Sequence, residues 1–86
     1  MSEINLVQAI EIAERYLNES VRDSFNSVQG DRWVVSAEKA VDCGEYWEFH
    51  YQSAMYLSTD NPSYLLVGNL PLRISKIGEV LGFSKG

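Results

Sequence analysis

Apolar residues recur every three or four positions near the start of the chain, which places them along one face of an α-helix. The stripe comprises Leu6, Ala9, Ile10, Ala13 and Leu17. Asn5 stands just before it, where its side chain can accept a hydrogen bond from the first turn, and Gln8 is placed to complete a capping box. The pattern predicts an amphipathic helix over about Leu6 to Val21, followed by a polar loop from Asp23 to Gly30.

The period changes to two between Tyr46 and Ser53, which is typical of a β-strand. One face of this run carries Trp47, Phe49 and Tyr51, and the other carries Glu48, His50 and Gln52. We expect the aromatic face to be buried, because large rings must supply most of the core in a small domain. We expect the polar face to lie in solvent.

A second alternating run precedes the aromatic one, over about Arg32 to Asp42. Its predicted inward residues, interrupted by Lys39, are Trp33, Val35, Ala37 and Val41. The short turn Cys43-Gly44-Glu45 separates the two runs, so together they predict an antiparallel hairpin.

The last third of the chain is read less directly. Residues 54–57 either extend the aromatic strand or bend away from it, and residues 65–67 form a short strand or an extended connector. The remaining predicted elements are a loop at 58–62, a turn at Gly68-Asn69, a strand at 72–75 with Leu72 and Ile74 inward, a turn at 76–79 and a strand at 80–83.

These elements predict a single domain over residues 1–86 of the α+β class. One N-terminal amphipathic helix packs on one face of a roughly four-stranded antiparallel sheet, because this hides both the helix stripe and the aromatic face. A chain of 86 residues buries only somewhat more than about 60% of the surface that it exposes when unfolded, so the core is small.

The net charge of −5 comes from 12 acids against 7 bases and is unevenly spread. Residues 1–60 hold 11 acids and 4 bases, a net −7, whereas residues 61–86 hold 1 acid and 3 bases, a net +2. An acidic domain repels nucleic acid and anionic membranes and attracts basic partners. We therefore expect no nucleic-acid or membrane partner.

The sequence favours the cytoplasm. Cys43 is the single cysteine, so no intrachain disulfide can form, and a small secreted domain usually has several. We see no secretory signal pattern and no apolar run of the roughly 20 residues that span a bilayer.

No catalytic, cofactor-binding or metal site is predicted. Cys43 and His50 are seven positions apart, which puts them on opposite faces of a regular strand, so Cys43 is expected to be a small buried or half-buried residue. Glu48 and His50 share a face, but structural zinc needs about four ligands. The glycines form no phosphate-binding motif. We expect the protein not to be an enzyme.

Several motifs together resemble a known family. They are the helix pattern Ala9-Ile10-x-Ile12-Ala13-x-x-Tyr16-Leu17, the strand Trp47-x-Phe49-x-Tyr51, Tyr56-Leu57, Leu66-Val67-Gly68-Asn69-x-Pro71-Leu72 and the hairpin Lys76-x-Gly78-Glu79-Val80. This pattern is similar to the immunity protein 35 family, which includes the YrhB-like proteins of bacteria. The chain departs from the family pattern at Ser75, where an Asp is usual, and at Ile77, where a Thr is usual.

The resemblance implies a small cytoplasmic immunity protein that binds and neutralises a cognate toxin, with papain-like protease domains among the linked toxins. The YrhB-like branch implies a chaperone-like activity as the alternative. The acidic charge points to a basic toxin, and the exposed final strand allows a monomer or a weak homodimer.

Exposed strand residues, tyrosines and a loop tip are the candidate contacts. Tyr56 and Tyr64 either lie at a protein-contact rim or close the ends of the core. The predicted partner-binding residues are Glu48, His50, Gln52, Tyr56, Asp60 and Tyr64.

Overall fold

The computed structural model describes residues 3–21, 31–66 and 70–84. The predicted loop at 23–30, Val67 and the turn at Gly68-Asn69 lie outside these residues. The chain begins with helix α1, Leu6–Tyr16, which continues as the wider turn η1, Leu17–Val21. The predicted start of the helix is therefore confirmed, and the helical stretch reaches Val21.

The start of α1 forms the predicted capping box. The backbone N–H of Gln8 donates to Asn5 Oδ1 at 2.8 Å, and the backbone N–H of Asn5 donates to Gln8 Oε1 at 2.9 Å. Two amides that have no partner within the helix are satisfied in this way, which defines where the helix begins.

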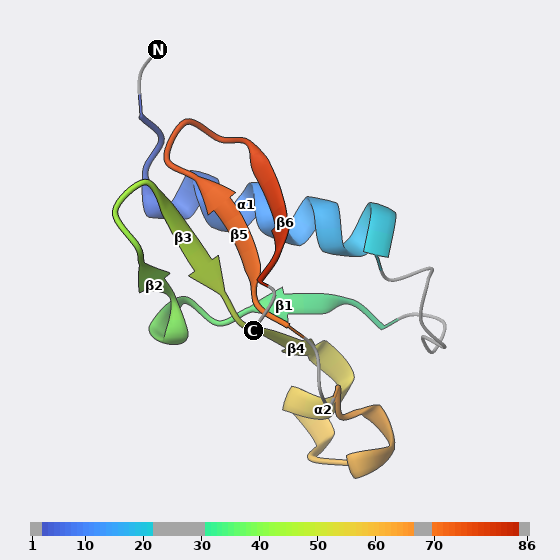
Figure 1. The fold of residues 1–86 in the computed structure, drawn as a ribbon. Coiled ribbons are helices and arrows are strands. Elements are labelled where there is room, and N and C mark those ends of the chain that lie inside the picture. Colours follow the sequence, from blue (N-terminus) through green and yellow to red (C-terminus); the bar gives the residue numbers. More distant parts are fainter. Residues whose placement is uncertain (1–2, 22–30, 67–69, 85–86) are drawn as a thin grey trace.

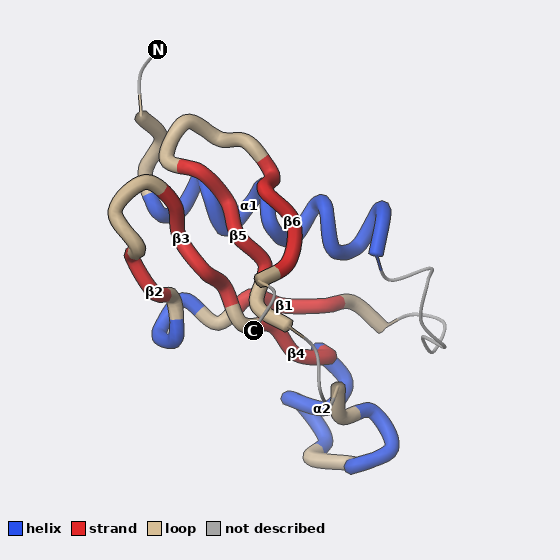
Figure 2. The backbone as a smooth tube through the Cα atoms, in the orientation of Figure 1, coloured by secondary structure: helices blue, strands red, loops and turns tan. Residues whose placement is uncertain are grey.

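Short strands and turns follow the helix (Figures 1 and 2). They are β1 (Trp33–Val35), η3 (Ala37–Lys39), β2 (Val41–Asp42), β3 (Tyr46–Phe49) and β4 (Tyr51–Ser53). After them come α2 (Ala54–Thr59), η4 (Pro62–Tyr64), β5 (Leu72–Ser75) and β6 (Val80–Phe83).

The strands form two antiparallel sheets. Four of them pair in the order β2-β3-β5-β6, and β1 pairs with β4 in a separate two-stranded sheet. The α+β class and the four-stranded sheet are thus confirmed.

The predicted hairpin is also present, with Val41 opposite Glu48 and Val35 opposite Tyr51. Each of its two predicted strands is interrupted, however: the first by η3 and the second at His50.

Three residues predicted to be buried or half-buried, Ala37, Val41 and Cys43, are exposed in the structure. The turn η3 changes the direction of the chain, so Ala37 and Val41 are exposed instead of facing the core. Cys43 is also exposed, because it lies at the tip of the hairpin beside Gly44, whose φ of 92° favours glycine. Two alternatives that the sequence left open are decided by the structure: residues 54–57 bend away as α2, and Leu65 and Leu66 form a connector.

The core lies between α1 and the sheets (Figure 1). Its buried hydrophobic residues are Ala9, Ala13, Leu17, Trp33, Val35, Trp47, Phe49, Tyr51, Leu72 and Ile74. The aromatic face of the predicted strand is buried, as expected. Leu6 is an exception within the helix stripe: it is 37% exposed because it lies in the first turn, at the edge of the helix–sheet contact.

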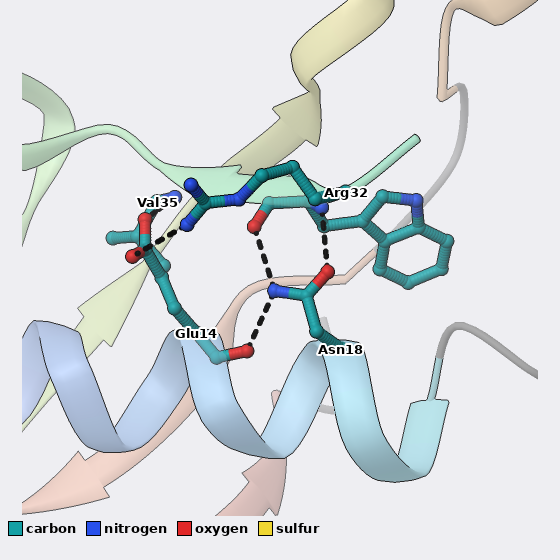
Figure 3. Close-up of polar contacts among 5 residues, drawn as sticks. Glu14, Asn18, Arg32 and Val35 are labelled. Carbon is teal, nitrogen blue, oxygen red and sulfur yellow. Dashed lines mark hydrogen bonds and ion pairs between the residues drawn. The ribbon is translucent and has the colours of Figure 1, made fainter. Parts of the chain in front are cut away.

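Polar side chains of α1 and η1 also hold the outer edge of β1 (Figure 3). Asn18 Oδ1 accepts from the backbone N–H of Trp33 at 2.8 Å, and Asn18 Nδ2 donates to the Trp33 carbonyl at 3.0 Å. One turn earlier, Glu14 Oε2 accepts from the backbone N–H of Val35 at 2.9 Å. These side chains form hydrogen bonds with the backbone groups at the outer edge of β1. A further strand would need the same groups to pair with β1.

Lys76 stabilises the tip of the hairpin. Its Nζ lies 2.9 Å from Asp42 Oδ1 and 4.5 Å from the centre of the Trp47 ring. The hydrogen bond from Lys76, followed by that from the Gly44 backbone amide, lowers the pKa of Asp42 below its usual value of 3.8. A carboxyl group whose pKa is lower in the folded than in the unfolded chain stabilises the fold at pH values above its unfolded pKa.

Asp42→Asn is therefore expected to lower stability at neutral pH, where the carboxylate is charged in both states. The difference from the unmodified chain should persist down to about pH 5 and shrink as the pH falls through the folded pKa of Asp42, below about 4. Urea titrations at pH 7, 5, 4 and 3 measure this. A difference that stays constant down to pH 3 would contradict the assignment, and Glu38→Gln, at an exposed site, is the matched control.

A candidate protein-binding cleft

Residues 54–64, which we call the arm, project from one end of the molecule (Figure 1). The arm consists of α2 and η4, and neither contains a buried residue. The Cα atoms of the molecule extend 41 × 23 × 22 Å, so the shape is elongated. The arm adds little to the core, which makes it available for another role.

A buried polar contact sets the direction in which the arm leaves β4. Ser53 Oγ donates to Asp31 Oδ2 and accepts from the backbone N–H of Tyr56 at 3.2 Å. Asp31 Oδ1 accepts from the backbone N–H of Met55 at 3.1 Å. The first turn of α2 is therefore capped by two buried side chains, and a capped start is a strong determinant of where a helix begins.

The far end of the arm turns back toward β4. Asp60 ends α2 with φ 56°, and its backbone N–H donates to the Tyr56 carbonyl at 2.7 Å. The chain then returns, and the Gln52 side chain holds Leu66: Oε1 accepts from Leu66 N–H at 2.7 Å, and Nε2 donates to the Leu66 carbonyl at 3.3 Å.

A cleft of about 740 Å³ lies between the two-stranded sheet and the arm. It is lined by Val34, Ser36, Lys39, His50, Tyr51, Gln52, Tyr56, Leu57 and Leu65. Leu57 and Leu65 are 56% and 38% exposed. The cleft thus joins exposed aliphatic side chains with the rings of Tyr51 and Tyr56 and with the side chains of Lys39 and His50.

Three of the six predicted partner-binding residues come together here: His50, Gln52 and Tyr56. The amide of Gln52 is already bound to Leu66, so it shapes the cleft more than it offers free contacts. Tyr56 is half-buried and belongs to an element without buried residues, so it lies at a rim rather than within the core.

The other three predicted residues do not line the cleft. Glu48 lies on the outer face of the four-stranded sheet, where it pairs with Arg73 at 2.8 Å. Asp60 is exposed at the end of α2, and Tyr64 is half-buried in η4. The hydrogen bond to Glu48 raises the pKa of the Arg73 guanidinium. The Glu48 carboxylate is thus engaged chiefly with Arg73 rather than with a partner.

Sequence reasoning missed Lys39, Leu57 and Leu65 as cleft residues. Leu57 and Leu65 lie on either side of the predicted loop at 58–62. A loop can bring the residues before and after it close together, so the sequence did contain a sign that these two leucines are neighbours. The sequence does not show Lys39 beside them, because that depends on η3 interrupting the first predicted strand.

The arrangement offers no nucleophile–base pair that we can identify in the described part of the chain. Cys43 is exposed at the hairpin tip, and its Sγ lies 3.9 Å from the Val41 carbonyl. Ser53 contacts Asp31, but His50 has the opposite parity in the strand run and lines the cleft on the other side. Within residues 3–21, 31–66 and 70–84, no three His, Cys, Asp or Glu side chains gather as potential metal ligands.

The helices that the structure describes are all too short or too polar to cross a membrane. Comparison with known proteins finds no family model, no curated protein and no solved structure that matches this chain.

Proposed function

We propose that this protein binds another protein through the arm and the adjoining cleft, and that it acts by covering the surface of its partner. The observation that supports this is the group of partly exposed side chains Tyr56, Leu57 and Leu65 around a concave site. Tyrosine is among the residues that most often carry the binding free energy of protein complexes, and the buried centre of an interface is more apolar than its rim. Tyr56 and Leu57 stand on α2, whose first turn is capped by Ser53, and Leu65 follows η4. A contact surface that is already formed before binding loses less entropy in the complex.

The finer part of the proposal is that the partner is a bacterial toxin and the protein is its immunity protein. This part rests on the motifs that resemble immunity protein 35, and it includes a papain-like protease domain as one possible toxin. Net charge of −5 supports a basic partner, because electrostatic steering raises association rates by about 10- to 1000-fold.

Co-expression with the product of the neighbouring gene tests the toxin partner. We expect the toxin alone to arrest growth, the pair to restore it, and the two proteins to elute together on gel filtration. Continued arrest together with separate elution would rule out that product as the partner.

A change within the cleft should weaken the complex without unfolding the protein. We expect the Tyr56→Ala, Leu57→Ala double variant to lose about 30-fold or more in affinity, or about 2 kcal/mol, as at other interface centres. Calorimetric titration measures this.

Leu81→Ala is the matched control, because Leu81 on β6 is 50% exposed and outside the cleft. Equal losses for both variants, or a loss for Leu81→Ala alone, would place the interface elsewhere.

A holdase-like chaperone is the second candidate, since several further large apolar residues are exposed. They include Val7, Val41, Leu70, Ile77, Val80 and Leu81. Scattered apolar residues are common on soluble proteins, whereas a holdase needs contiguous patches of several hundred Å² or so. The test is whether the protein suppresses the aggregation of heated citrate synthase. Suppression that is equally strong with the Tyr56→Ala, Leu57→Ala double variant would favour the chaperone function.

A further inference from the structure

The cleft differs in charge from the rest of the molecule. The chain has 12 acids and 7 bases, yet none of the described residues that line the cleft is acidic. Its ionisable lining includes Lys39 and His50. The cleft therefore presents the positive charge of Lys39 to an incoming group.

Lys39 is distinguished from most other described bases by its lack of an ion pair. Arg32, Arg73 and Lys76 are each paired with a carboxylate: Glu14, Glu48 and Asp42 respectively. No carboxylate of the described residues lies within ion-pair distance of Lys39, which is exposed on η3. Its ammonium, with three donors, is available to an incoming acceptor.

The apolar part of the lining lies beside this cation. Leu57 and Leu65 are on the arm side, and Val34 is on the two-stranded sheet. A volume of about 740 Å³ falls within the range of about 300–1,000 Å³ typical of ligand sites. The cleft is thus matched to an occupant that combines aliphatic bulk with negative charge.

We propose that the cleft binds a segment of the partner protein in which apolar side chains stand next to a carboxylate. This deepens the proposed function and rests on it, because it identifies the chemistry of the partner at the contact. The carboxylate pairs with Lys39, and the apolar side chains pack against Leu57 and Leu65.

A basic partner can carry such a segment without conflict. At physiological ionic strength the Debye length is about 8 Å, so charges elsewhere on a molecule 41 Å long are largely screened at the cleft. The net charge then governs the encounter, whereas Lys39 and its neighbours govern which segment docks.

Two peptides that differ only in charge test this on the whole chain. One is acetylated, amidated Leu-Glu-Leu-Leu-Glu-Leu, and the other has lysine in place of each glutamate. We expect the acidic peptide to shift the ¹⁵N–¹H signals of cleft residues in a saturable manner. We expect it to bind at least about fivefold more tightly than the lysine peptide.

Charge reversal at one position provides the control. Lys39→Glu is expected to reverse the preference between the two peptides. Arg15→Glu makes the same change of net charge on α1, at an exposed residue outside the cleft, and should keep the acidic preference.

Each other outcome overturns the inference. Equal affinities for both peptides would show that only apolar contact matters. Equal effects of Lys39→Glu and Arg15→Glu would show a response to net charge. Signals that shift outside the cleft, or no binding at millimolar peptide, would remove the assigned site. Because the partner-complex titration uses different molecules, each of these results leaves the proposed function to its own test.

Discussion

Trp33→Ala is expected to lower the free energy of unfolding by about 3–5 kcal/mol, the range for removing a buried large aromatic side chain. Trp33 is 1% exposed, and its ring stacks on Tyr51 with 5.6 Å between centroids. The backbone of Trp33 is held by Asn18, so the surrounding structure cannot readily collapse into the space left by the ring. Domains of this kind are stable by only about 5–15 kcal/mol.

Urea denaturation followed by circular dichroism measures the loss. Trp33→Phe keeps a ring at the site and is expected to lose less, which provides a folded comparison if Trp33→Ala does not fold. Val34→Ala is the neighbouring control, because Val34 is only half-buried and faces the cleft. A loss below about 1 kcal/mol for Trp33→Ala would show that the two-stranded sheet is not part of the cooperative core.

Asp31→Ala is the second large effect, and we expect it to cost about 3 kcal/mol. The carboxylate is buried and accepts from the backbone of Arg32 and Met55 and from the Ser53 hydroxyl. Hydrogen bonds to charged groups contribute about 1.5–3 kcal/mol each, and groups left unpaired add a desolvation cost. Asp31→Asn keeps two acceptor sites and should lose less.

The same substitution should loosen the arm. Because Asp31 and Ser53 cap the first turn of α2, we expect the amides of Met55 and Tyr56 to exchange with solvent faster in Asp31→Ala than the amides of α1. Hydrogen exchange measured by NMR follows this. Glu38→Ala removes an exposed carboxylate and is the control. Uniform acceleration throughout the chain would mean that Asp31 supports the whole fold and not the arm in particular.

Local patterns predicted a large part of the fold. The helix stripe, the capping box at Asn5 and Gln8, and the alternation of Trp47, Phe49 and Tyr51 each depend on residues within a few positions of one another. Such signals survive in the structure, because a capping box and a two-residue period have one favourable arrangement.

Predictions failed where a distant contact decided the outcome. The run from Arg32 to Asp42 alternates almost without interruption, yet it is divided between two sheets. Glu14 on α1 and Asn18 on η1 accept hydrogen bonds from the backbone of β1, whereas β2 pairs with β3. Alternation alone does not show where the run bends: β1 buries Trp33 and Val35, whereas both residues of β2 are exposed.

In the candidate site, too, local patterns identified some residues and distant contacts decided the rest. Of the six residues predicted to contact a partner, His50, Gln52 and Tyr56 line the cleft, whereas Glu48, Asp60 and Tyr64 lie outside it. Lys39 and Leu65 were missed, because they reach the cleft only after η3 and the returning arm have formed.

The sequence by itself determined the helix, its cap, the buried aromatic face and the α+β class, since these follow from short-range periodicity and side-chain chemistry. Only the tertiary structure decided that the arm leaves the sheet and encloses a cleft. That choice depends on Asp31 meeting Ser53 across 22 positions and on Gln52 holding Leu66 across 14. Contacts at such separations form only when the intervening chain has folded, so no local pattern encodes them.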